Sequence, residues 1–379
     1  MKKIFYWSPC LDMIGTVKST INSASSIARY SKKNIKIKLI NSCGEWEKYK
    51  EILKREEVEV IDFYKSYYDF LPKKGFIQSR LSNLIVFLLS FFPLLKLLKK
   101  EKPDFVIIHL ITSLPLILLK FFNFNTKFIL RISGYPRLNF SRKFLWRMLS
   151  KKIFKVTCPS KDLADQLKKL KIFPEEKIFF LPDAVFSMEY LRKKIKENQN
   201  KKLEKNFFLA VGRLTKQKNF SYLIDEFSKY VKNNPSQKLF IFGEGEEKKK
   251  LKKQIIDNRL EDNIFLKGNS NLIFNYMRNA QLFILSSLWE EPGIVLIESA
   301  LNNLFIISSN CKNGPREFLN NGKGGILFEN NLRGELLSKI VDFKNLSREE
   351  KKLRTLAAKK NSRKYSMFNH YKELSTLLT

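Results

Sequence analysis

The feature that most constrains the fold is a regular alternation of short apolar runs with longer stretches of helical periodicity. The apolar runs are four to seven residues long and rich in Ile, Phe, Val and Leu, as in FVIIH at 105–109. Strands that are apolar throughout and separated by helices form parallel sheets that are covered on both faces. The sequence predicts such strands at 3–7, 35–40, 58–63, 105–109, 127–132, 154–158 and 177–181, and again at 207–212, 238–243, 263–268, 281–287, 304–309 and 325–328.

The two groups of strands predict two domains. A chain of 379 residues is too long for one compact core. Residues 187–206 are polar and contain no apolar run, so we interpret them as a linker. The predicted architecture is therefore α/β, with two tandem Rossmann-like, doubly wound domains at 1–186 and 207–360. Ligands of open parallel sheets bind beyond the carboxyl ends of the strands, so two such domains would face each other across a cleft that holds the ligand.

Composition alone does not decide the function. The chain has 71 Lys and Arg against 37 Asp and Glu, a formal net charge of +34. This charge favours a polyanion or an anionic lipid surface as partner, but solvated lysines encoded by A/T-rich codons explain it equally well. The four cysteines are not spaced as a zinc or CxxC site, which indicates reduced thiols in the cytoplasm. With only two histidines, a multi-histidine metal site is nearly excluded.

One segment raises the question of a membrane. Residues 81–100 (LSNLIVFLLSFFPLLKLLKK) are strongly apolar, but Pro93 and Lys96 interrupt a stretch shorter than the roughly 20 residues that a spanning helix needs. We interpret the segment as a helix that packs inside the protein or lies in a membrane interface. Residues 1–10 lack the long apolar run of a signal peptide, which predicts a cytoplasmic protein.

Basic residues and glycines follow the first two strands of the second domain. Gly212 ends the first strand, and Arg213 and Lys218 follow it in a loop where two cations suit a diphosphate. With 71 basic residues in the chain, chance is an equal explanation before other evidence. Gly243 and Gly245 follow the next strand and allow a close backbone approach, which suits a nucleotide or simply a tight turn.

Two glutamates bracket a Pro-Gly pair after another strand. In SSLWEEPGIVLIESALNN, residues 286–303, Glu290 precedes Pro292-Gly293 and Glu298 lies more than a turn into an apolar helix. An acid near a helix N-terminus usually complements the helix dipole, which explains Glu290 without a ligand. An unpaired carboxylate at Glu298 is costly unless hydroxyl groups bind it, and sugar or ribose hydroxyls would do so. The open amides of Gly293, Ile294 and Val295 would form an anion site.

Taken in order, these motifs resemble family 4 glycosyltransferases of the GT-B fold. The stretch that reads roughly S-x-x-E-G-F-G-L-V-L-L-E-A in that family reads SLWEEPGIVLIES here, with Glu291 replacing a glycine. The resemblance implies that Arg213 and Lys218 bind the diphosphate of a nucleoside-diphosphate sugar and stabilise its departure. Glu298 would hold ribose hydroxyls and Glu290 the donor sugar, without a metal or other cofactor.

In the first domain the resemblance is looser. Gly15 and Thr16 stand where the family often has a Gly-Gly loop that contacts the donor, and Ser133-Gly134 replace a His-Gly pair. His109 ends a strand beside the predicted cleft, where a cleft-lining role and a purely structural role are equally plausible. The C-terminal segment 361–379 is compatible with a helix and, by the resemblance, packs back on the first domain.

The resemblance implies transfer of a sugar, with retention of configuration, to a glycan or lipid-linked acceptor. We expect a role in bacterial surface polysaccharide biosynthesis, such as lipopolysaccharide or capsule, and peripheral association with the inner face of the cell membrane. Segments 74–100 and 114–124 would suit a membrane-anchored acceptor, although internal helices explain them as well. The alternatives are a basic nucleic-acid-binding protein, for which no recognisable module is present, and an inactive GT-B scaffold.

Overall fold

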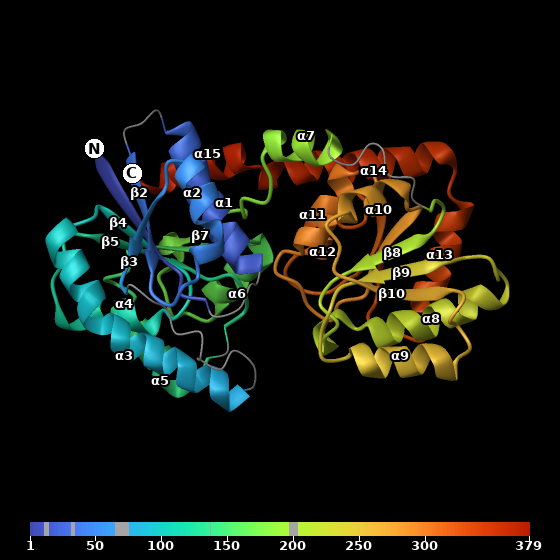
Figure 1. The fold of residues 1–379 in the computed structure, drawn as a ribbon, viewed down its shortest axis with the longest axis horizontal. Helices are drawn as coiled ribbons and strands as arrows, with labels where there is room; N and C mark the ends of the chain where they lie inside the picture. Colours follow the sequence, from blue (N-terminus) through green and yellow to red (C-terminus); the bar gives the residue numbers. More distant parts are fainter. Residues whose placement is uncertain (11–14, 32–34, 65–75, 137, 197–203) are drawn as a thin grey trace. The chain divides into compact units, whose positions relative to one another are not determined.

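The chain forms two compact units in a computed structural model that describes residues 1–10, 15–31, 35–64, 76–136, 138–196 and 204–379. The first unit comprises Met1–Phe186 and Tyr365–Thr379, and the second comprises Ser187–Lys364 (Figure 1). Each unit is built around its own parallel sheet.

The first unit contains a seven-stranded sheet with the order β3-β2-β1-β4-β5-β6-β7. Every neighbouring pair of strands is parallel. The strands are β1 (Lys2–Trp7), β2 (Ile35–Asn41), β3 (Glu59–Asp62), β4 (Phe105–Ile108), β5 (Lys127–Arg131), β6 (Lys155–Cys158) and β7 (Ile178–Phe180). The helices are α1 (Gly15–Tyr30), α2 (Lys50–Arg55), α3 (Phe76–Glu101), α4 (Ser113–Phe121), α5 (Phe140–Leu149), α6 (Lys161–Lys169) and α15 (Met367–Leu377).

Alternate residues of the central strands point to opposite faces of this sheet and form two separate cores. Phe5 and Trp7 of β1 belong to a core that includes side chains of α3, α4, α5 and α6. Ile4 and Tyr6 belong to a core on the other face, with side chains of α1, α2 and α15. The sheet is therefore buried on both faces, which explains why its strands are apolar throughout.

The second unit contains a six-stranded parallel sheet with the order β10-β9-β8-β11-β12-β13. Its strands are β8 (Phe208–Val211), β9 (Leu239–Phe242), β10 (Ile264–Gly268), β11 (Leu282–Leu285), β12 (Phe305–Ser309) and β13 (Ile326–Phe328). Its helices are α7 (Met188–Lys196), α8 (Phe220–Lys232), α9 (Lys248–Asp257), α10 (Ile273–Asn279), α11 (Ile294–Leu301), α12 (Pro315–Phe318), α13 (Glu335–Asn345) and α14 (Arg348–Ser362).

The predicted α/β architecture with two doubly wound sheets is confirmed, and each predicted apolar run contains a strand. The domain boundaries differ in detail. The predicted linker, 187–206, lies in the second unit and contains α7, with residues 197–203 outside the described part. The chain returns to the first unit at Tyr365, and α15 packs there with Leu374, Leu377 and Leu378 in the core formed with α1.

The apolar segment at 81–100 is part of a longer helix than the sequence predicts. Helix α3 runs through Pro93 and ends at Glu101. By length and composition, its part Leu81–Glu101 is long and apolar enough to cross a membrane. The most apolar 18 residues of this part have a mean hydropathy of 2.0, and 28% of them are buried. The prediction that the segment is too short for a span was therefore wrong on length. In the structure its inner side packs on the sheet through Leu94 and Leu98.

Candidate functional site

The candidate site in the second unit lies where the strand order reverses. Strands β8 and β11 are neighbours, and the chain leaves them toward opposite edges of the sheet, β9 on one side and β12 on the other. At such a switch point the loops after the two strands diverge and expose the carboxyl edge, which is where ligands of open α/β sheets bind. Lys218 follows β8 and Glu290 follows β11, so both predicted residues lie at this point.

Lys218 and Glu290 form a buried ion pair. The Nζ of Lys218 donates to Oε1 of Glu290 at 2.5 Å, and only 12% and 5% of the two side chains are exposed. The hydroxyl of Ser287, in the same loop as Glu290, donates to the same oxygen. A buried carboxylate needs such partners, and here it receives both a cation and a hydroxyl.

Further hydrogen bonds hold the two loops against each other. Leu288 N donates to the carbonyl of Gln217 at 2.8 Å, and the Gln217 amide donates to the carbonyl of Trp289 at 2.8 Å. The hydroxyl of Ser286 donates to the carbonyl of Lys218, also at 2.8 Å. Lys218 ends a short 3₁₀ turn, Lys216–Lys218, so these bonds fix the backbone that carries the ammonium group.

The predicted glycines allow the β8 and β9 loops to touch. A Cβ atom on Gly243, whose φ is +140°, would lie 1.9 Å from the carbonyl oxygen of Gly212. A Cβ atom on Gly245 would lie 2.3 Å from the carbonyl oxygen of Leu214, and one on Gly212 would lie 3.1 Å from the stem of Lys218. Because a Cβ atom on Gly243 or Gly245 would overlap a backbone carbonyl, these two glycines bring the β9 loop onto the backbone that precedes Lys218.

Arg213 lies in the same loop as Lys218, and α11 begins shortly after Glu290. Arg213 is exposed, and its backbone nitrogen lies in the loop contact around Gly243. Gly293, with a φ of +85°, is the residue before α11. Ile294, Val295 and Glu298 are half-buried on that helix. Because Glu298 is half-buried, its carboxylate avoids the full cost of burial.

The loop after β12 closes around Glu290 and was not predicted. Cys311 is buried there, and burial followed by the nearby charge of Glu290 raises the pKa of its thiol to about 12. Asn313 donates to Glu291 at 2.6 Å, and a Cβ atom on Gly314 would lie 2.4 Å from the carbonyl oxygen of Pro292. The sequence alone does not show these contacts, because they depend on how the loops after β11 and β12 pack together.

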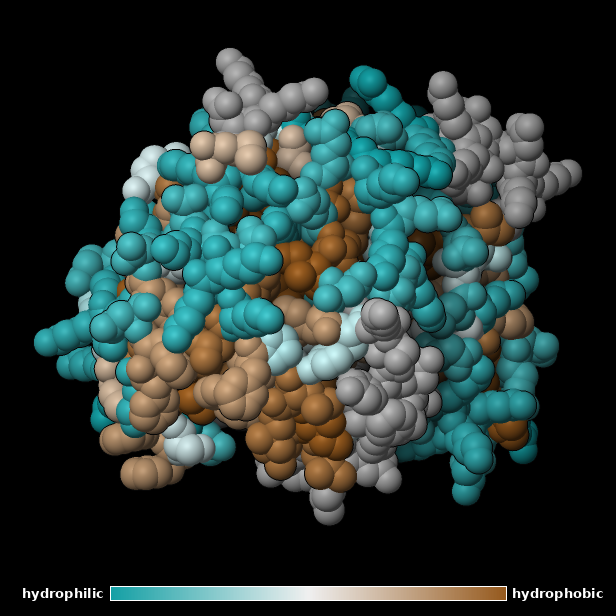
Figure 2. All heavy atoms as spheres, turned by 60° about the vertical axis from the view of Figure 1, so that its left-hand side comes forward, coloured by the Kyte–Doolittle hydropathy of each residue, from teal (hydrophilic) through white to brown (hydrophobic). Residues whose placement is uncertain are grey.

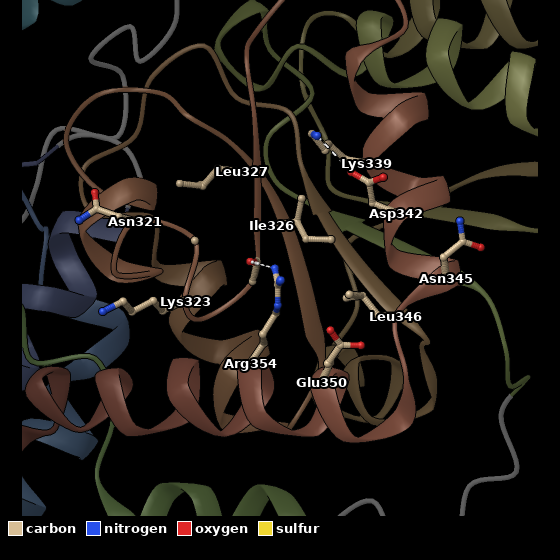
Figure 3. A pocket seen from close by; sticks show the side chains of 12 residues that line it. Asn321, Lys323, Ile326, Leu327, Lys339, Asp342, Asn345, Leu346, Glu350 and Arg354 are labelled. Carbon is tan, nitrogen blue, oxygen red and sulfur yellow. Dashed lines mark hydrogen bonds and ion pairs between the residues drawn. The ribbon is translucent and has the colours of Figure 1, made fainter.

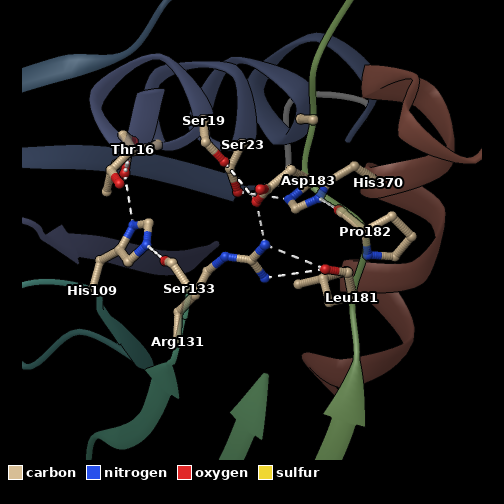
Figure 4. A network of polar contacts seen from close by, with 12 residues as sticks. Thr16, Ser19, Ser23, His109, Arg131, Ser133, Leu181, Pro182, Asp183 and His370 are labelled. Atoms are coloured by element: carbon tan, nitrogen blue, oxygen red, sulfur yellow. Dashed lines mark hydrogen bonds and ion pairs between the residues drawn. The ribbon is translucent and has the colours of Figure 1, made fainter. Parts of the chain in front are cut away.

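In the first unit, His109 is buried at the end of β4 and both of its ring nitrogens have partners (Figure 4). Nδ1 hydrogen-bonds the hydroxyl of Thr20 at 3.0 Å, and Nε2 hydrogen-bonds the hydroxyl of Ser133. Burial, together with the charge of Arg131, lowers the pKa of His109 to about 3, so the ring is neutral. Of the two predicted roles, the structural one accounts for these bonds.

Three more predicted residues lie near His109. Gly15 and Thr16 are the first two residues of α1, and the carbonyl of Thr16 accepts from the Thr20 hydroxyl at 3.0 Å. Ser133 and Gly134 line, together with His109, a cavity of about 980 Å³. Of the predicted residues in the first unit, His109, Ser133 and Gly134 therefore line the same cavity.

A second buried network lies beside His109 and was not predicted. Arg131 forms an ion pair with Asp183 and donates to the carbonyl of Leu181 at 3.2 Å (Figure 4). Burial alone would raise the pKa of Asp183, but Arg131 and a hydrogen bond from Ser19 hold the pKa below its ordinary value. This ion pair joins the end of β5 to the segment after β7.

His370 of α15 is also buried in the first unit. Its Nδ1 donates to the carbonyl of Pro182 at 2.6 Å, and its Nε2 accepts from the hydroxyl of Ser23 at 2.7 Å. Burial, with the charge of Arg131, lowers the pKa of His370 to about 4. These bonds attach the C-terminal helix to α1 and to the segment after β7.

Another cavity, of about 870 Å³, lies at the start of β13 and between α13 and α14 (Figure 3). Arg354 there donates to the carbonyl of Gly325 at 3.1 Å, and Lys339 pairs with Asp342 at 3.1 Å. This cavity contains none of the predicted site residues and lies at the amino end of β13, away from the switch point.

Within the described residues, no group of three His, Cys, Asp or Glu side chains is arranged to hold a metal ion.

The family model described as glycosyl transferases group 1 matches residues 192–362, which include Lys218, Glu290 and Glu298. A glycosyltransferase from Rickettsia africae has a solved structure that covers 100% of this chain and 97% of its own, with a TM-score of 0.76 and 20% identity. The fold is that of the GT-B glycosyltransferases.

Other GT-B structures and sequence relatives cover different shares of the chain. Anabaena HepE, solved with UDP and glucose, covers 100% of this chain and 99% of its own, with a TM-score of 0.71 and 15% identity. An uncharacterized glycosyltransferase of Methanocaldococcus jannaschii is 31% identical over 255 residues, 60% of this chain and 61% of its own length. The chain therefore spans about three fifths of that relative.

An Escherichia coli relative carries a more specific name. The UDP-Gal:alpha-D-GlcNAc-diphosphoundecaprenol alpha-1,3-galactosyltransferase is 29% identical over 288 residues, 68% of this chain and 71% of its own. The matched region of 288 residues is longer than the second unit, Ser187–Lys364. The similarity is therefore not confined to the residues that the family model covers.

Proposed function

We propose that the chain is a nucleotide-sugar-dependent glycosyltransferase of family 4, which transfers a sugar with retention of configuration to a glycan or lipid-linked acceptor. One observation carries the proposal: the buried Lys218–Glu290 pair lies at the switch point of the second sheet, inside the region that matches glycosyl transferases group 1. A desolvated charge pair is costly to bury, and a phosphate that entered at the switch point would meet a cation that the two loops already hold in place.

The donor's diphosphate would bind through the cations after β8. Lys218 is held in place beside Glu290, and the exposed Arg213 is free to turn toward a phosphate entering from solvent. The phosphate oxygens would compete with Glu290 for the ammonium group, so the carboxylate would turn to the donor sugar's hydroxyls. Charge that develops on the leaving diphosphate would be stabilised by both cations, without a metal ion.

Glu298 would bind the ribose hydroxyls of the nucleotide. It is half-buried as the fifth residue of α11, and a carboxylate there can accept two hydroxyl hydrogen bonds. Glu290 would lie near the positive charge at the anomeric carbon. Attack from the same face as the leaving group would retain the configuration, with a phosphate oxygen accepting the acceptor's proton.

The acceptor belongs to the first unit in this proposal. The Escherichia coli relative is named for a diphosphoundecaprenol acceptor and for UDP-galactose, and HepE was solved with UDP. By similarity, we propose that the donor is a sugar linked to uridine diphosphate and that the acceptor belongs to bacterial surface glycan synthesis. We also propose that the enzyme acts at the cytoplasmic side of the membrane.

A thermal-shift panel with UDP, GDP, ADP and their sugars tests the donor assignment. One nucleotide should raise the melting temperature in a concentration-dependent way, because a ligand that binds only the folded state stabilises it by mass action. The matching nucleotide sugar should then be hydrolysed slowly or transferred to a polyprenyl-diphosphate sugar. Stabilisation by no nucleotide, with salt-sensitive binding to RNA or DNA, would contradict the proposal.

A further inference from the structure

Helix α3 buries one face against the first unit and leaves an apolar stripe exposed on the opposite face. Residues 82, 86, 90, 94 and 98 are buried against the first unit. On the opposite side of the helix Leu81, Leu84, Leu88 and Phe92 are 53%, 53%, 60% and 74% exposed. A helix of a globular protein normally keeps polar residues on its outer face, so this stripe calls for a partner.

Neighbouring helices extend the same apolar surface. Phe140, Phe144 and Met148 follow one another at four-residue spacing along α5 and are 87%, 58% and 38% exposed. Phe121, at the end of α4, is 67% exposed. In Figure 2 apolar side chains gather in a continuous brown and tan area on the lower part of this face, with hydrophilic residues in teal above it. We call these eight side chains on α3, α4 and α5 the apolar surface.

The charges at its border are almost all positive. Residues 81–101, 113–121 and 140–149 contain seven basic side chains, all exposed, and one acid. That acid, Glu101, faces Lys3 and Lys38 on the sheet side at 3.6 and 3.3 Å. The basic side chains are Lys96, Lys99, Lys100, Lys120, Arg142, Lys143 and Arg147.

A cavity connects the apolar surface with the carboxyl edge of the first sheet. The cavity of about 980 Å³ is lined by Leu84, Phe121 and Phe144 of the apolar surface and, elsewhere on its wall, by His109 and Ser133. Its lining is mainly apolar, with polar groups near the ends of β4 and β5. Such a cavity suits a molecule with an apolar chain and a polar head.

We infer that the apolar surface docks the first unit on a bilayer that contains anionic lipids, and that the adjoining cavity receives the head-group end of a lipid-linked acceptor. Apolar side chains that enter the interface and lysines that meet lipid phosphates act together in peripheral binding. The inference rests on the proposed function for the identity of the acceptor, but not for the docking itself.

The observations favour a bilayer surface over other occupants. A second copy of the chain would bring an equally basic border against this one, and like charges oppose that contact. Crossing the bilayer would require Val86, Leu94 and Leu98 to leave the core of the first unit, where they are at most 2% exposed. A surface contact uses the exposed stripe and leaves the core intact.

Flotation of the full chain with vesicles tests the inference. Vesicles of phosphatidylglycerol and phosphatidylcholine in equal parts should carry the protein upward, and pure phosphatidylcholine should carry much less. Leu88→Glu should weaken partitioning by at least about tenfold, because it replaces an inserting side chain with a charge. Leu353→Glu on α14 is its matched control, since Leu353 is also 60% exposed.

A pair of charge variants separates local from overall electrostatics. Lys143→Glu with Arg147→Glu should weaken binding to the anionic vesicles by roughly thirtyfold or more, since each basic residue near such a surface contributes about 1 kcal/mol. Lys249→Glu with Lys253→Glu, exposed on α9, changes the net charge by the same amount and should bind like the wild type. Equal losses in both pairs would overturn the inference, as would equal flotation of Leu88→Glu and Leu353→Glu.

The nucleotide thermal shift distinguishes the two proposals. A chain that is stabilised by a nucleotide but stays away from the vesicles overturns the docking and leaves the transferase. A chain that floats as expected but responds to no nucleotide keeps the docking and overturns the transferase. Self-association that Leu88→Glu abolishes, without flotation, would assign the apolar surface to a second copy.

Discussion

The ammonium group of Lys218 donates to Oε1 of Glu290 at 2.5 Å across 72 positions of sequence, with both side chains largely buried. Taken alone, Lys218 is one of 71 basic residues, and Glu290 is an acid near the N-terminus of a helix. Together they form a desolvated pair between the two loops that diverge from the switch point of the second sheet. A phosphate that bound Lys218 would therefore also change the partner of Glu290, which links diphosphate recognition to the acid that we propose for the donor sugar.

Removing the cation should leave Glu290 buried without a counter-charge. We expect Lys218→Met to cost roughly 3 to 5 kcal/mol of the free energy of unfolding of the second unit. Lys216→Met, an exposed lysine in the same 3₁₀ turn, should change it by less than about 0.5 kcal/mol. Thermal melting of the full chain measures the difference. Identical melting of Lys218→Met and Lys216→Met would show that the pair is not desolvated.

Adding Glu290→Gln to Lys218→Met should restore part of the lost stability, because the uncharged amide needs no counter-charge.

The sequence placed Lys218 and Glu290 in the right loops but could not show that they touch. The βα rhythm predicts which residues follow a strand, and the parallel sheet brings the carboxyl ends of neighbouring strands to one edge. Which side chains then pair depends on strand order and on loop contacts such as Leu288 to Gln217. Cys311, in the loop after β12, was not predicted as part of the site, because nothing in the sequence distinguishes a single buried cysteine from other core residues.

The two glutamates should differ in what they affect. We expect Glu298→Ala to abolish the thermal shift by the matching nucleotide, which amounts to about 2.7 kcal/mol of stabilisation at a hundred times Kd. Glu290→Ala should keep most of that shift and lower kcat far more than nucleotide affinity, because the role that we propose for Glu290 is to bind the donor sugar. Glu349→Ala, exposed on α14, should match the wild type in both measurements. The same shift and the same rate in all three variants would contradict both roles.

The first unit shows the limit of single-residue reasoning. His109 was identified from its place after a strand, but its partners Thr20 and Ser133 come from α1 and from the segment after β5. The Arg131–Asp183 pair was missed because Arg131 is the last residue of an apolar strand and one of 71 basic residues. Only the three-dimensional path of the chain brings it to Asp183.

The contact between the β8 and β9 loops should not tolerate a side chain. In Gly243→Ala the new methyl group would overlap the carbonyl oxygen of Gly212, and the backbone at φ +140° would be strained as well. We expect a loss of about 3 kcal/mol and a weaker nucleotide shift, since the loop before Lys218 must move. Gly334→Ala is the comparison for backbone strain alone, because its φ is +82° and no atom lies near the new methyl group. It should cost about 1 kcal/mol and leave the nucleotide shift unchanged. Equal losses would mean that strain, and not the contact with Gly212, requires a glycine at 243.

The buried histidines should make the first unit sensitive to acid. The pKa of His370 is lowered to about 4 in the folded protein, whereas an unfolded histidine titrates near 6.5. Between these values the unfolded chain binds a proton that the folded chain refuses, so stability is lost as pH falls from about 6.5 toward 4. At pH 4.5 the loss through His370 should reach about 2 to 3 kcal/mol.

The variant His370→Gln isolates this contribution. It should be less stable than the wild type at pH 7.5, because the hydrogen bonds to Pro182 and Ser23 are disturbed, and the gap should narrow as pH falls to 4.5. His109, the only other histidine in the chain, stays in both proteins, and so do the carboxylates, so their titration cancels in the difference. Unfolding in urea at a series of pH values measures the gap. Curves that run parallel from pH 7.5 to 4.5 would show that the ring of His370 takes up its proton as easily in the folded protein as in the unfolded chain.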